Sequence, residues 1–456
     1  MTLFETTLGT LDRLQPIELI GTVAEVRGLT VLVDDLPLPI GGIVEIVSGR
    51  ERRVGEVVGF DDDQTIVMLM GFTQGIRRGD RVIGKQSAAV APVGSDMLGR
   101  VVNALGEPVD GHGPIRETFG RAVQPDPIDP LRRVPIDEPL GTGVKAMDAM
   151  LTVGRGQRLG IFAGPGIGKS TLLGQIARHA DADVSVIALV GERGREVADF
   201  LTRCLGEEGL QRSVVVVATG DEPALMRVRA ASYALTVAEY FRDEGLDVVL
   251  FMDSVTRFCQ AQRQIGLAVG EPPATKGYTP SVFAMLPTLM ERCGRIETGS
   301  ITGFFTILVE GDDLTEPVSD AARGILDGHV VLSRDLANRG HWPAIDVLQS
   351  VSRLANDVVD PRHRQAREQV TRMLSIYRDV EDLVNIGAYN TGASDENDLA
   401  IEVQEPIRNL LTQSDGKIFT FEQSQQTLLA VGAAIDQKAA ELARRSRQSG
   451  GGMKPA

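Results

Sequence analysis

Short apolar runs separated by turn residues occupy the first part of the chain. Between about Ile17 and Val90, Val- and Ile-rich runs such as IELIGTVAEV, LTVLVDD and TIVMLMGF are divided by Gly, Asp and Pro. Alternation at this short spacing, with little helical periodicity, is typical of a small all-β barrel or sandwich. We therefore expect residues 1–92 to form an N-terminal β-barrel domain.

The middle of the chain follows a different pattern, in which continuous apolar runs alternate with segments of helical periodicity. The runs are LGIFAG, VSVIALVGE, SVVVVATG, DVVLFMD and ITGFFTILVEG. Strands that are apolar on both faces and are joined by helices indicate a mainly parallel sheet covered on both sides. A Pro- and Gly-rich passage from about Pro92 to Gly143 precedes these runs and is typical of a linker. Residues 93–357 are therefore expected to form a doubly wound α/β domain.

Only helical periodicity remains beyond Asp360, in segments such as RQAREQVTRMLSIYRDVEDLVNI and EQSQQTLLAVGAAIDQKAAELARRS. Apolar positions three and four residues apart predict amphipathic helices that pack together. The pattern thus predicts a C-terminal helical domain over residues 358–446. A flexible tail is expected at 447–456, where the sequence is RQSGGGMKPA.

Composition and charge narrow the classes of protein that fit this plan. The 456 residues include 62 acidic and 47 basic side chains, for a net charge of −15. This balance works against the broad basic surface that gives nonspecific affinity for nucleic acid. The 3 cysteines lack metal-ligand spacing, and the chain has neither a secretory signal nor a run of about 18 apolar residues that could span a bilayer. We expect a cytoplasmic protein with no nucleic-acid partner.

A glycine-rich loop between a predicted strand and a predicted helix is the strongest signal for chemistry. In GIFAGPGIGKSTLLGQIA, residues 160–177, glycines let the backbone curl around phosphate oxygens, and the helix start adds its positive dipole end. The common pattern has glycine where this chain has Ala163, but the remaining glycines preserve the curl. The expected nucleotide-binding residues are those of the loop and the first helical turn: Gly164, Pro165, Gly166, Ile167, Gly168, Lys169, Ser170 and Thr171.

The loop predicts a site for a nucleoside triphosphate with Mg²⁺. Lys169 is expected to contact the β- and γ-phosphates, and the Ser170 hydroxyl is expected to bind the metal. A second metal-binding carboxylate is expected at the end of a buried strand, where DVVLFMDS places Asp253. An aspartate at a strand end is a weak signal by itself, and it gains weight from the glycine-rich loop.

A further pair of carboxylates follows the strand VSVIALV in the segment GERGREVADF. Glu192 and Glu196 are four residues apart, so at the start of a helix they would share one face. A carboxylate held at this edge of the sheet can orient and deprotonate an attacking water. We expect Glu192 to be the general base and Glu196 to touch the water shell of the metal. Without the loop, the pair would more simply be a solvated helix start.

Several longer segments resemble one family. The run VAEYFRDEGLDVVLFMDSVTRFCQAQRQIGLAVGEPPATKGYTPSVFAMLP and the segments EGDD and EDLVNIGAY are similar to the export ATPases of flagellar and injectisome type III secretion, which are relatives of rotary ATP synthase catalytic subunits. PATKGY, EGDD and EDLVNIGAY resemble the flagellar branch more closely. The resemblance covers roughly residues 20–440. It implies a RecA-like P-loop domain in a homohexamer that hydrolyses ATP to energise or gate flagellar protein export, by unfolding substrates or releasing chaperones.

The resemblance also assigns roles to residues outside the loop. SVSR at 350–353 matches the segment that supplies an arginine finger, so Arg353 would reach the nucleotide of a neighbouring subunit. GHWPAID matches the segment whose aromatic residue stacks on adenine, and here Trp342 stands where the family usually has tyrosine. Arg193 and Arg257 match positions near the γ-phosphate. The resemblance thus predicts that all four side chains lie around a bound nucleotide.

The implied partners are those of an export apparatus. The loop GEPPATKGYTP, with Tyr278, would face a central channel into which a stalk-like export protein inserts. A stator-like regulator would dock on the N-terminal segment MTLFETTLGTLDRLQP, whose apolar residues have roughly helical spacing. The other implied partners are the export gate at the membrane, export substrates and their chaperones. These place the protein at the cytoplasmic face of the inner membrane.

Four alternatives remain at this stage. The first is an export ATPase of an injectisome rather than of a flagellum, which would differ only in its partners. A rotary ATP synthase subunit is disfavoured by PATKGY and EDLVNIGAY, and an RNA-translocating helicase by the first 90 residues, where Phe4, Phe60 and Phe72 are the only aromatic residues. A ring subunit that binds nucleotide without hydrolysing it is disfavoured because Glu192, Lys169 and Asp253 are all present.

Overall fold

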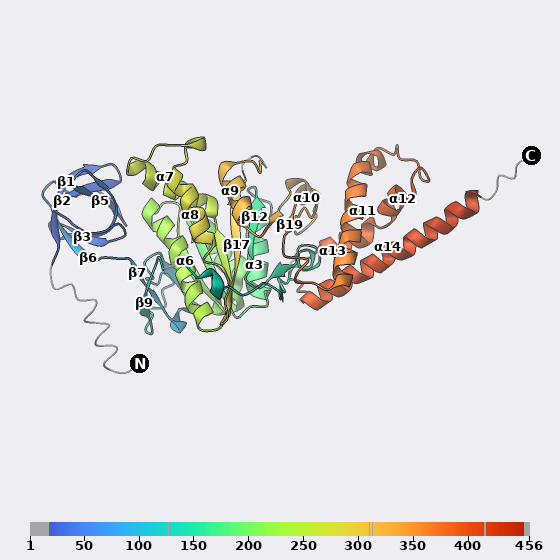
Figure 1. The fold of residues 1–456 in the computed structure, drawn as a ribbon, viewed down its shortest axis with the longest axis horizontal. Coiled ribbons are helices and arrows are strands. Elements are labelled where there is room, and N and C mark those ends of the chain that lie inside the picture. The colour runs from blue at the N-terminus through green and yellow to red at the C-terminus, as the bar shows by residue number, and fades with distance from the viewer. Residues whose placement is uncertain (1–17, 126, 310, 312, 415, 451–456) are drawn as a thin grey trace, which may run out of the picture.

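The computed structural model describes residues 18–450 except 126, 310, 312 and 415, with the backbone alone for 446–450. The N-terminal segment expected to dock a regulator, residues 1–16, lies outside these residues. Figure 1 shows three parts in a row: a β-barrel at one end, a body with a central sheet, and a set of helices from which the last one projects. This order confirms the predicted fold class of barrel, α/β body and C-terminal helices.

The barrel contains six antiparallel strands and is closed in the order β1-β2-β5-β4-β3-β6. Their bounds are β1 Ile20–Arg27, β2 Thr30–Asp34, β3 Ile43–Ser48, β4 Glu51–Asp61, β5 Gln64–Leu69 and β6 Arg81–Gln86. Alternate valines such as Val31 and Val33 of β2 are fully buried inside it. The short Val- and Ile-rich runs of the sequence thus correspond to the strands, because successive side chains of a strand point to opposite faces and one set lies in the barrel core.

The body is built on one mostly parallel sheet in the order β19-β18-β12-β17-β15-β13-β14-β8, with β16 beside β17. The bounds are β8 Val101–Asn103, β12 Arg158–Ala163, β13 Val184–Val190, β14 Ser213–Ala218, β15 Asp247–Asp253, β16 Gly294–Arg295, β17 Ser300–Leu308, β18 Gly328–Val331 and β19 Val351–Ser352. Only β16 and β19 run antiparallel to their neighbours. Every parallel strand therefore ends at one common edge, where the glycine-rich loop also lies.

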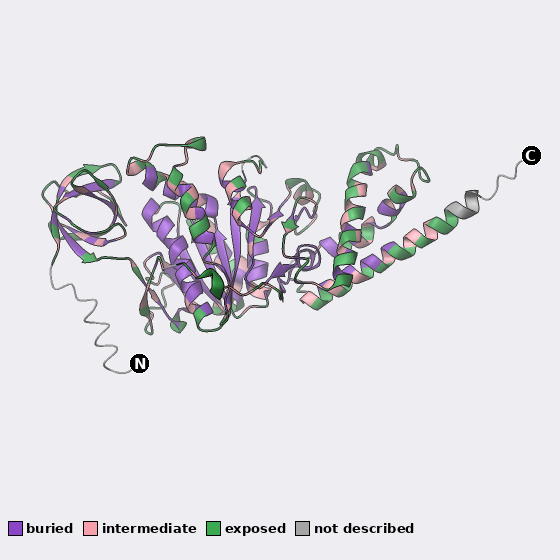
Figure 2. Cartoon of the chain, viewed as in Figure 1, coloured by how far each residue is buried: buried purple, intermediate pink, exposed green. Residues whose placement is uncertain are grey.

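Helices cover both faces of this sheet, and the burial follows the sheet and these helices (Figure 2). The helices of the body are α2 Lys145–Met150, α3 Lys169–His179, α4 Gly194–Asp199, α5 Gly206–Gln211, α6 Ala224–Asp243, α7 Val255–Ala268, α8 Pro280–Met290, α9 Pro317–Ile325 and α10 Arg334–Asn338. One π-helical segment, Phe200–Leu205, and short 3₁₀ turns at Ser95–Met97, Pro130–Arg132 and Thr275–Gly277 complete this part. The packing confirms the doubly wound body.

The passage expected to be a linker contributes to the body, which the sequence did not reveal. β8 pairs in parallel with β14 at the edge of the sheet. Two small antiparallel pairs lie nearby, one of β7 Val90–Val93 with β9 Phe119–Ala122 and one of β10 Pro139–Leu140 with β11 Val153–Gly154. Strands of two to four residues carry too little periodicity to be distinguished from a Pro- and Gly-rich loop.

The C-terminal part consists of α11 Pro361–Asn385, α12 Asp395–Glu402, α13 Gln404–Leu411 and α14 Phe421–Gly450. α11 begins where predicted because the Asp360 side chain caps it, accepting hydrogen bonds from the backbone N–H groups of Arg362 and His363. α14 continues to Gly450, so the first four residues of the expected flexible tail are helical; the rest of the tail lies outside the described residues.

A buried carboxyl group joins the C-terminal helices to the body. Asp148 of α2 is fully buried and accepts hydrogen bonds from the backbone N–H of Thr142 at 2.8 Å and from its hydroxyl at 2.6 Å. The hydroxyl of Ser424 on α14 lies 3.5 Å from its other oxygen. Burial raises the pKa of Asp148 to about 7, although these hydrogen bonds act to lower it.

Asp148→Asn is expected to make the protein relatively more stable as the pH rises. Because the folded-state pKa is raised, the stabilisation from protonated Asp148 is complete below the unfolded pKa and is lost as the pH rises through about 7. Asparagine does not ionise, so between pH 4 and pH 8 the variant should gain about 4 kcal/mol of unfolding free energy relative to the parent. Urea denaturation at several pH values measures this gain, with the exposed Asp379→Asn as control. Parallel pH profiles for Asp148→Asn and the parent would contradict it.

Candidate active site

The glycine-rich loop joins the end of β12 to the start of α3. Gly166 and Gly168 have φ angles of 79° and 85°, in the left-handed region that side chains with a Cβ rarely adopt. The loop can therefore curl and direct its N–H groups inward, and the first turn of α3 adds its own free N–H groups and dipole. Ser170 and Thr171 are exposed on that turn. This geometry is that of a phosphate-binding loop.

Three charged residues predicted separately lie together beside the loop. The ammonium group of Lys169 forms an ion pair and hydrogen bond with Asp253, at the end of β15, and its Nζ lies 3.5 Å from Oε1 of Glu192, which follows β13. The Thr306 hydroxyl donates to Oδ1 of Asp253 at 2.8 Å. Because parallel strands end at one edge, residues far apart in sequence meet here.

The surroundings of these residues shift their protonation equilibria. Burial acts to lower the pKa of Lys169, but the charges of Asp253 and Glu192 outweigh it and raise the pKa above its usual value. Burial raises the pKa of Glu192 to about 7; Lys169 acts against this, while Asp253 and Glu196 add to it. A carboxylate with a pKa near neutral pH is suited to accept a proton from water.

The prediction that Glu192 and Glu196 share the start of a helix is wrong for Glu192. Gly191 turns the chain at φ 73°, and α4 begins only at Gly194. A residue in a left-handed conformation ends the strand before the helix can begin, so Glu192 lies in the connecting loop and points towards Lys169. The Glu196 carboxyl group is nevertheless near enough to help raise the pKa of Glu192.

The two arginines expected near the γ-phosphate differ in surroundings. Arg193 is exposed, and its Nη1 lies 3.3 Å from Oε1 of Glu196. Arg257, in the first turn of α7, packs against Gly191, where an added Cβ would come within 2.7 Å of its own Cβ. Its Nη1 donates to Gln260 at 3.1 Å, and its buried Nε has no hydrogen-bond partner among the residues that the structure describes. Arg257 thus has donor capacity that an anion can use.

Trp342 lies on the other side of the glycine-rich loop. Its ring covers Gly168, where an added Cβ would be 2.9 Å from Cζ3. The ring borders a cavity of about 460 Å³ that extends from the loop to the chain after α13. The cavity is lined by Gly166, Ile167, Gly168, Thr171, Leu172, Gln175, Leu332, Trp342, Pro343, Ala344, Gln413 and Ser414. A half-exposed indole facing an open cavity beside a phosphate loop is suited to stack on a base.

Arg353 does not reach this loop. It follows β19, its backbone N–H bonds the carbonyl of Asp327, and its Nη2 donates to the carbonyl of Arg323 at 3.1 Å. Asp327 is in turn bound to Arg158, at the start of β12. The loop lies at the other end of that strand, roughly 16 Å away at the usual rise per residue. Arg353 is exposed there.

The oxygen donors beside the loop fit Mg²⁺. This metal prefers hard oxygen ligands and usually binds through one or two carboxylates together with substrate phosphates. The Ser170 hydroxyl and the Asp253 carboxylate are such donors. Glu196, expected in the outer shell, contacts Glu192 and remains partly exposed.

Sequence reasoning missed three residues that shape the site. Thr306 is a polar residue within the otherwise mostly apolar strand ITGFFTIL, and its hydroxyl there could have indicated a role in the site. Arg334 donates to the carbonyl of Pro165 in the loop at 3.3 Å. Gln413 lines the base cavity from the C-terminal part, and nothing in its local sequence indicates this.

Comparisons with known proteins agree with this geometry. The nucleotide-binding domain of the ATP synthase alpha/beta family matches residues 143–352, and the beta-barrel domain of that family matches residues 23–85. The T3SS EscN ATPase C-terminal domain matches residues 359–430. The chain is thus a P-loop ATPase built on the plan of the ATP synthase alpha/beta family.

Whole-chain relatives define the family more closely. The flagellum-specific ATP synthase of Treponema pallidum is 50% identical over 93% of this chain and 95% of its own, and that of Bacillus subtilis is 47% identical over 90% and 94%. The type 3 secretion system ATPase of Xanthomonas euvesicatoria is 46% identical over 90% and 93%. The chain belongs to the family of flagellum-specific ATP synthases and type III secretion ATPases.

Two solved structures share the fold over nearly the whole chain. The assembled ATPase EscN from the enteropathogenic E. coli type III secretion system aligns with a TM-score of 0.85 and 41% identity, over 90% of this chain and 100% of that one. EscN in complex with its central stalk EscO gives a TM-score of 0.84 at 40% identity, with the same coverage. In the described part of this chain, no helix is long and apolar enough to cross a bilayer.

Proposed function

We propose that this chain forms a homohexameric ring that hydrolyses ATP with Mg²⁺ and thereby energises or gates flagellar type III protein export. The observation that carries the proposal is the cluster of Lys169, Asp253 and Glu192 beside the phosphate-binding loop. The assembled state of the related EscN supports a ring. The position of Arg353, remote from the chain's own loop, supports a site completed by a neighbouring subunit.

The proposed reaction transfers the γ-phosphoryl group of ATP to water. Glu192 accepts a proton from the attacking water, a bond forms between the water oxygen and the γ-phosphorus, and the bond to the bridging oxygen breaks to release ADP and phosphate. Lys169 and Arg257 stabilise charge on the phosphates, with Arg193 at the exposed rim. Mg²⁺, held by Ser170 and Asp253, would neutralise charge on the β- and γ-phosphates.

The flagellar branch is favoured over the injectisome. Flagellum-specific relatives from three bacteria are 47–50% identical to this chain, and PATKGY and EDLVNIGAY are similar to that branch. The margin over the Xanthomonas secretion ATPase is small, so use by an injectisome is the second candidate.

The proposed partners are those of the export apparatus. The related EscN binds a central stalk, EscO, which supports a stalk-like partner for this chain at the loop containing Tyr278. We further propose a stator-like regulator, the export gate, export substrates and their chaperones, and a location at the cytoplasmic face of the inner membrane.

Lys169→Ala tests the proposed function. The purified variant should lose about 10²-fold or more of the Mg²⁺-dependent ATPase activity, because it lacks the cation that stabilises the phosphates. Cells carrying the variant should retain filament protein inside and secrete none, as measured by immunoblotting of culture medium. Lys438→Ala, on α14 away from the loop, is the matched control. Normal secretion by the Lys169→Ala strain would contradict the proposal, and loss of injectisome substrates alone would favour the second candidate.

A further inference from the structure

One buried side chain from the C-terminal part closes the base cavity. Gln413, after α13, is 8% exposed. Its Oε1 accepts a hydrogen bond from the backbone N–H of Lys145 at 2.8 Å, and its Nε2 donates to the carbonyls of Gly143 at 2.9 Å and Lys417 at 2.6 Å. Its own backbone N–H donates to the carbonyl of Trp342 at 2.8 Å. Three chain segments therefore meet at this residue: 143–145, the stretch at Trp342, and 413–417.

The amide of Gln413 is fully used. A glutamine side chain offers one carbonyl acceptor and two N–H donors, and each of these has a partner here. Leucine offers none of these groups, and glutamate keeps the acceptor but has no donor. Gln413→Leu would therefore leave both the carbonyl of Gly143 and the N–H of Lys145 without this partner in a buried position, and Gln413→Glu would do so for the carbonyl of Gly143, which is costly.

These contacts connect the C-terminal part to both walls of the base cavity. The carbonyl of Gly143 also lies 3.5 Å from Nε2 of Gln175, which belongs to α3, the helix that directly follows the phosphate loop. On the other wall, the backbone bond from Gln413 holds the carbonyl of Trp342, whose ring covers Gly168. A displacement of the chain after α13 would move Trp342 relative to the loop.

We propose that Gln413 is the positioning residue for Trp342 and makes nucleotide affinity depend on the docking of the C-terminal helices. This inference rests on the proposed role of Trp342 in stacking on the base. Gln413 itself touches neither phosphate nor reacting atoms, so its loss should affect binding of the nucleotide rather than the chemical step.

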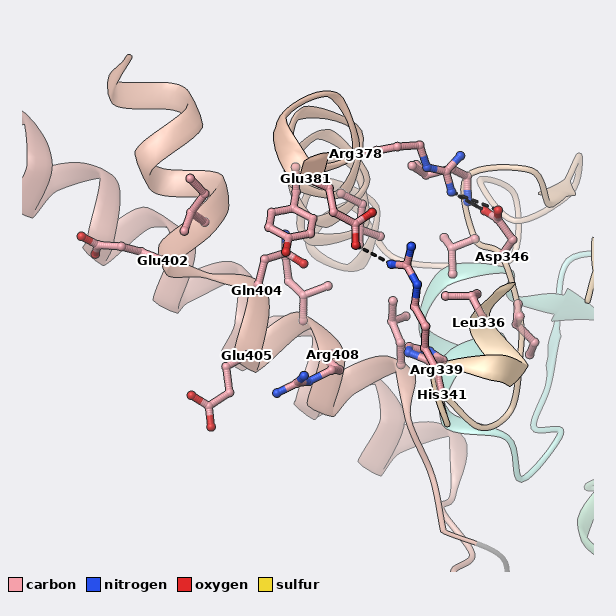
Figure 3. A pocket seen from close by; sticks show the side chains of 18 residues that line it. Leu336, Arg339, His341, Asp346, Arg378, Glu381, Glu402, Gln404, Glu405 and Arg408 are labelled. Atoms are coloured by element: carbon pink, nitrogen blue, oxygen red, sulfur yellow. Dashed lines mark hydrogen bonds and ion pairs between the residues drawn. The ribbon is translucent and has the colours of Figure 1, made fainter. Parts of the chain in front are cut away.

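Other contacts between the body and the C-terminal helices do not involve Gln413. A cavity of about 480 Å³ lies between the body and the C-terminal helices. Figure 3 shows two ion pairs among the residues that line it, Arg339 with Glu381 and Arg378 with Asp346. The Arg378 guanidinium lies 2.9 Å and 3.0 Å from the two Asp346 oxygens and is half exposed. This pair joins the two parts without contacting the Trp342 backbone. Arg378→Ala is therefore a matched control that weakens docking alone.

The experiment compares the parent, Gln413→Leu and Arg378→Ala. Trp342 is the only tryptophan in the chain, so its emission reports on this position directly. Titration with MgADP should change the emission of the parent. In Gln413→Leu we expect the emission maximum without nucleotide to shift to longer wavelength. The MgADP concentration at the titration midpoint should rise about tenfold. KM for ATP should rise by a similar factor, while kcat stays within threefold of the parent value. Arg378→Ala should titrate like the parent.

Three results would overturn the inference. A parent that responds to MgADP together with a Gln413→Leu variant that titrates identically would refute it and leave the role of Trp342 intact. Equal increases in KM for Gln413→Leu and Arg378→Ala would show that docking alone matters. No response in the parent, with unchanged KM in Trp342→Ala, would overturn both the inference and the stacking role. If Gln413→Leu fails to fold by circular dichroism, Gln413→Glu, which keeps the acceptor and the backbone bond, replaces it with the same expectations.

Discussion

Arg353→Ala should lower the kcat of the assembled ATPase by about 10³-fold while leaving ATP binding within severalfold of the parent. Arginine fingers in GTPases contribute about 10³ to 10⁵ in rate because they stabilise charge that develops only in the transition state. In this chain Arg353 is exposed near the start of β12, at the end opposite to the phosphate-binding loop. We therefore propose that it acts on the nucleotide of a neighbouring subunit.

Mixing two inactive variants gives the sharpest test of this expectation. Arg353→Ala keeps an intact phosphate loop, and Lys169→Ala keeps an intact Arg353. In a mixed ring, an interface is therefore complete where the Arg353→Ala subunit supplies the loop and the Lys169→Ala subunit supplies the arginine, whereas the reverse interface lacks both groups. Steady-state hydrolysis should reappear on mixing, although each variant alone is inactive. Mixtures that stay inactive, although light scattering shows them assembled, would refute a shared site, as would an active Arg353→Ala protein.

Glu192→Gln is expected to lower kcat by about 10²- to 10⁴-fold, the range typical for removal of a general base. Glutamine preserves the size of the side chain but does not accept a proton. ATP binding should be retained or strengthened, because a negative charge beside the phosphates is removed. Single-turnover hydrolysis and binding of a fluorescent nucleotide measure the two effects separately.

The pH profile ties this effect to Glu192 itself. Burial raises its pKa to about 7 in the protein without nucleotide, so the fraction able to accept a proton, and with it kcat/KM for ATP, should rise as the pH increases through that value. Glu192→Gln should lack this rise. Glu196→Gln should move it to lower pH, because the Glu196 carboxylate favours the protonated form of Glu192 and so helps to raise its pKa. A Glu192→Gln protein with activity within threefold of the parent, or with an unchanged pH profile, would exclude the residue as the base.

Features formed by consecutive residues were predictable from the sequence. The phosphate-binding loop depends on backbone conformations that only glycine adopts easily, and Lys169 and Ser170 follow the glycines directly. The residues that bind phosphate and metal are therefore adjacent in the sequence and can be recognised from it. The barrel and the buried parallel strands were predictable because side-chain periodicity reflects which faces are covered. The role of Arg353 came from resemblance, and the structure adds the physical reason why it is remote from its own loop.

Features that depend on short elements or distant partners were not predictable. β8 has three residues, too few for a periodic signal. The turn at Gly191 removed Glu192 from the expected helix, and its contact with Lys169 arises because both residues lie at the same sheet edge.

The sequence by itself determined the class of this protein, because a phosphate loop, a strand-end carboxylate and the alternation of apolar runs are local patterns. Only the tertiary structure decided how the base cavity is closed. Gln413 is separated from Lys145 by 268 positions and from Gly143 by 270, and its local sequence resembles any polar helix end. Such a contact exists only when the C-terminal helices pack against the body, since a buried amide must find its hydrogen-bond partners in whichever segments the fold brings to it.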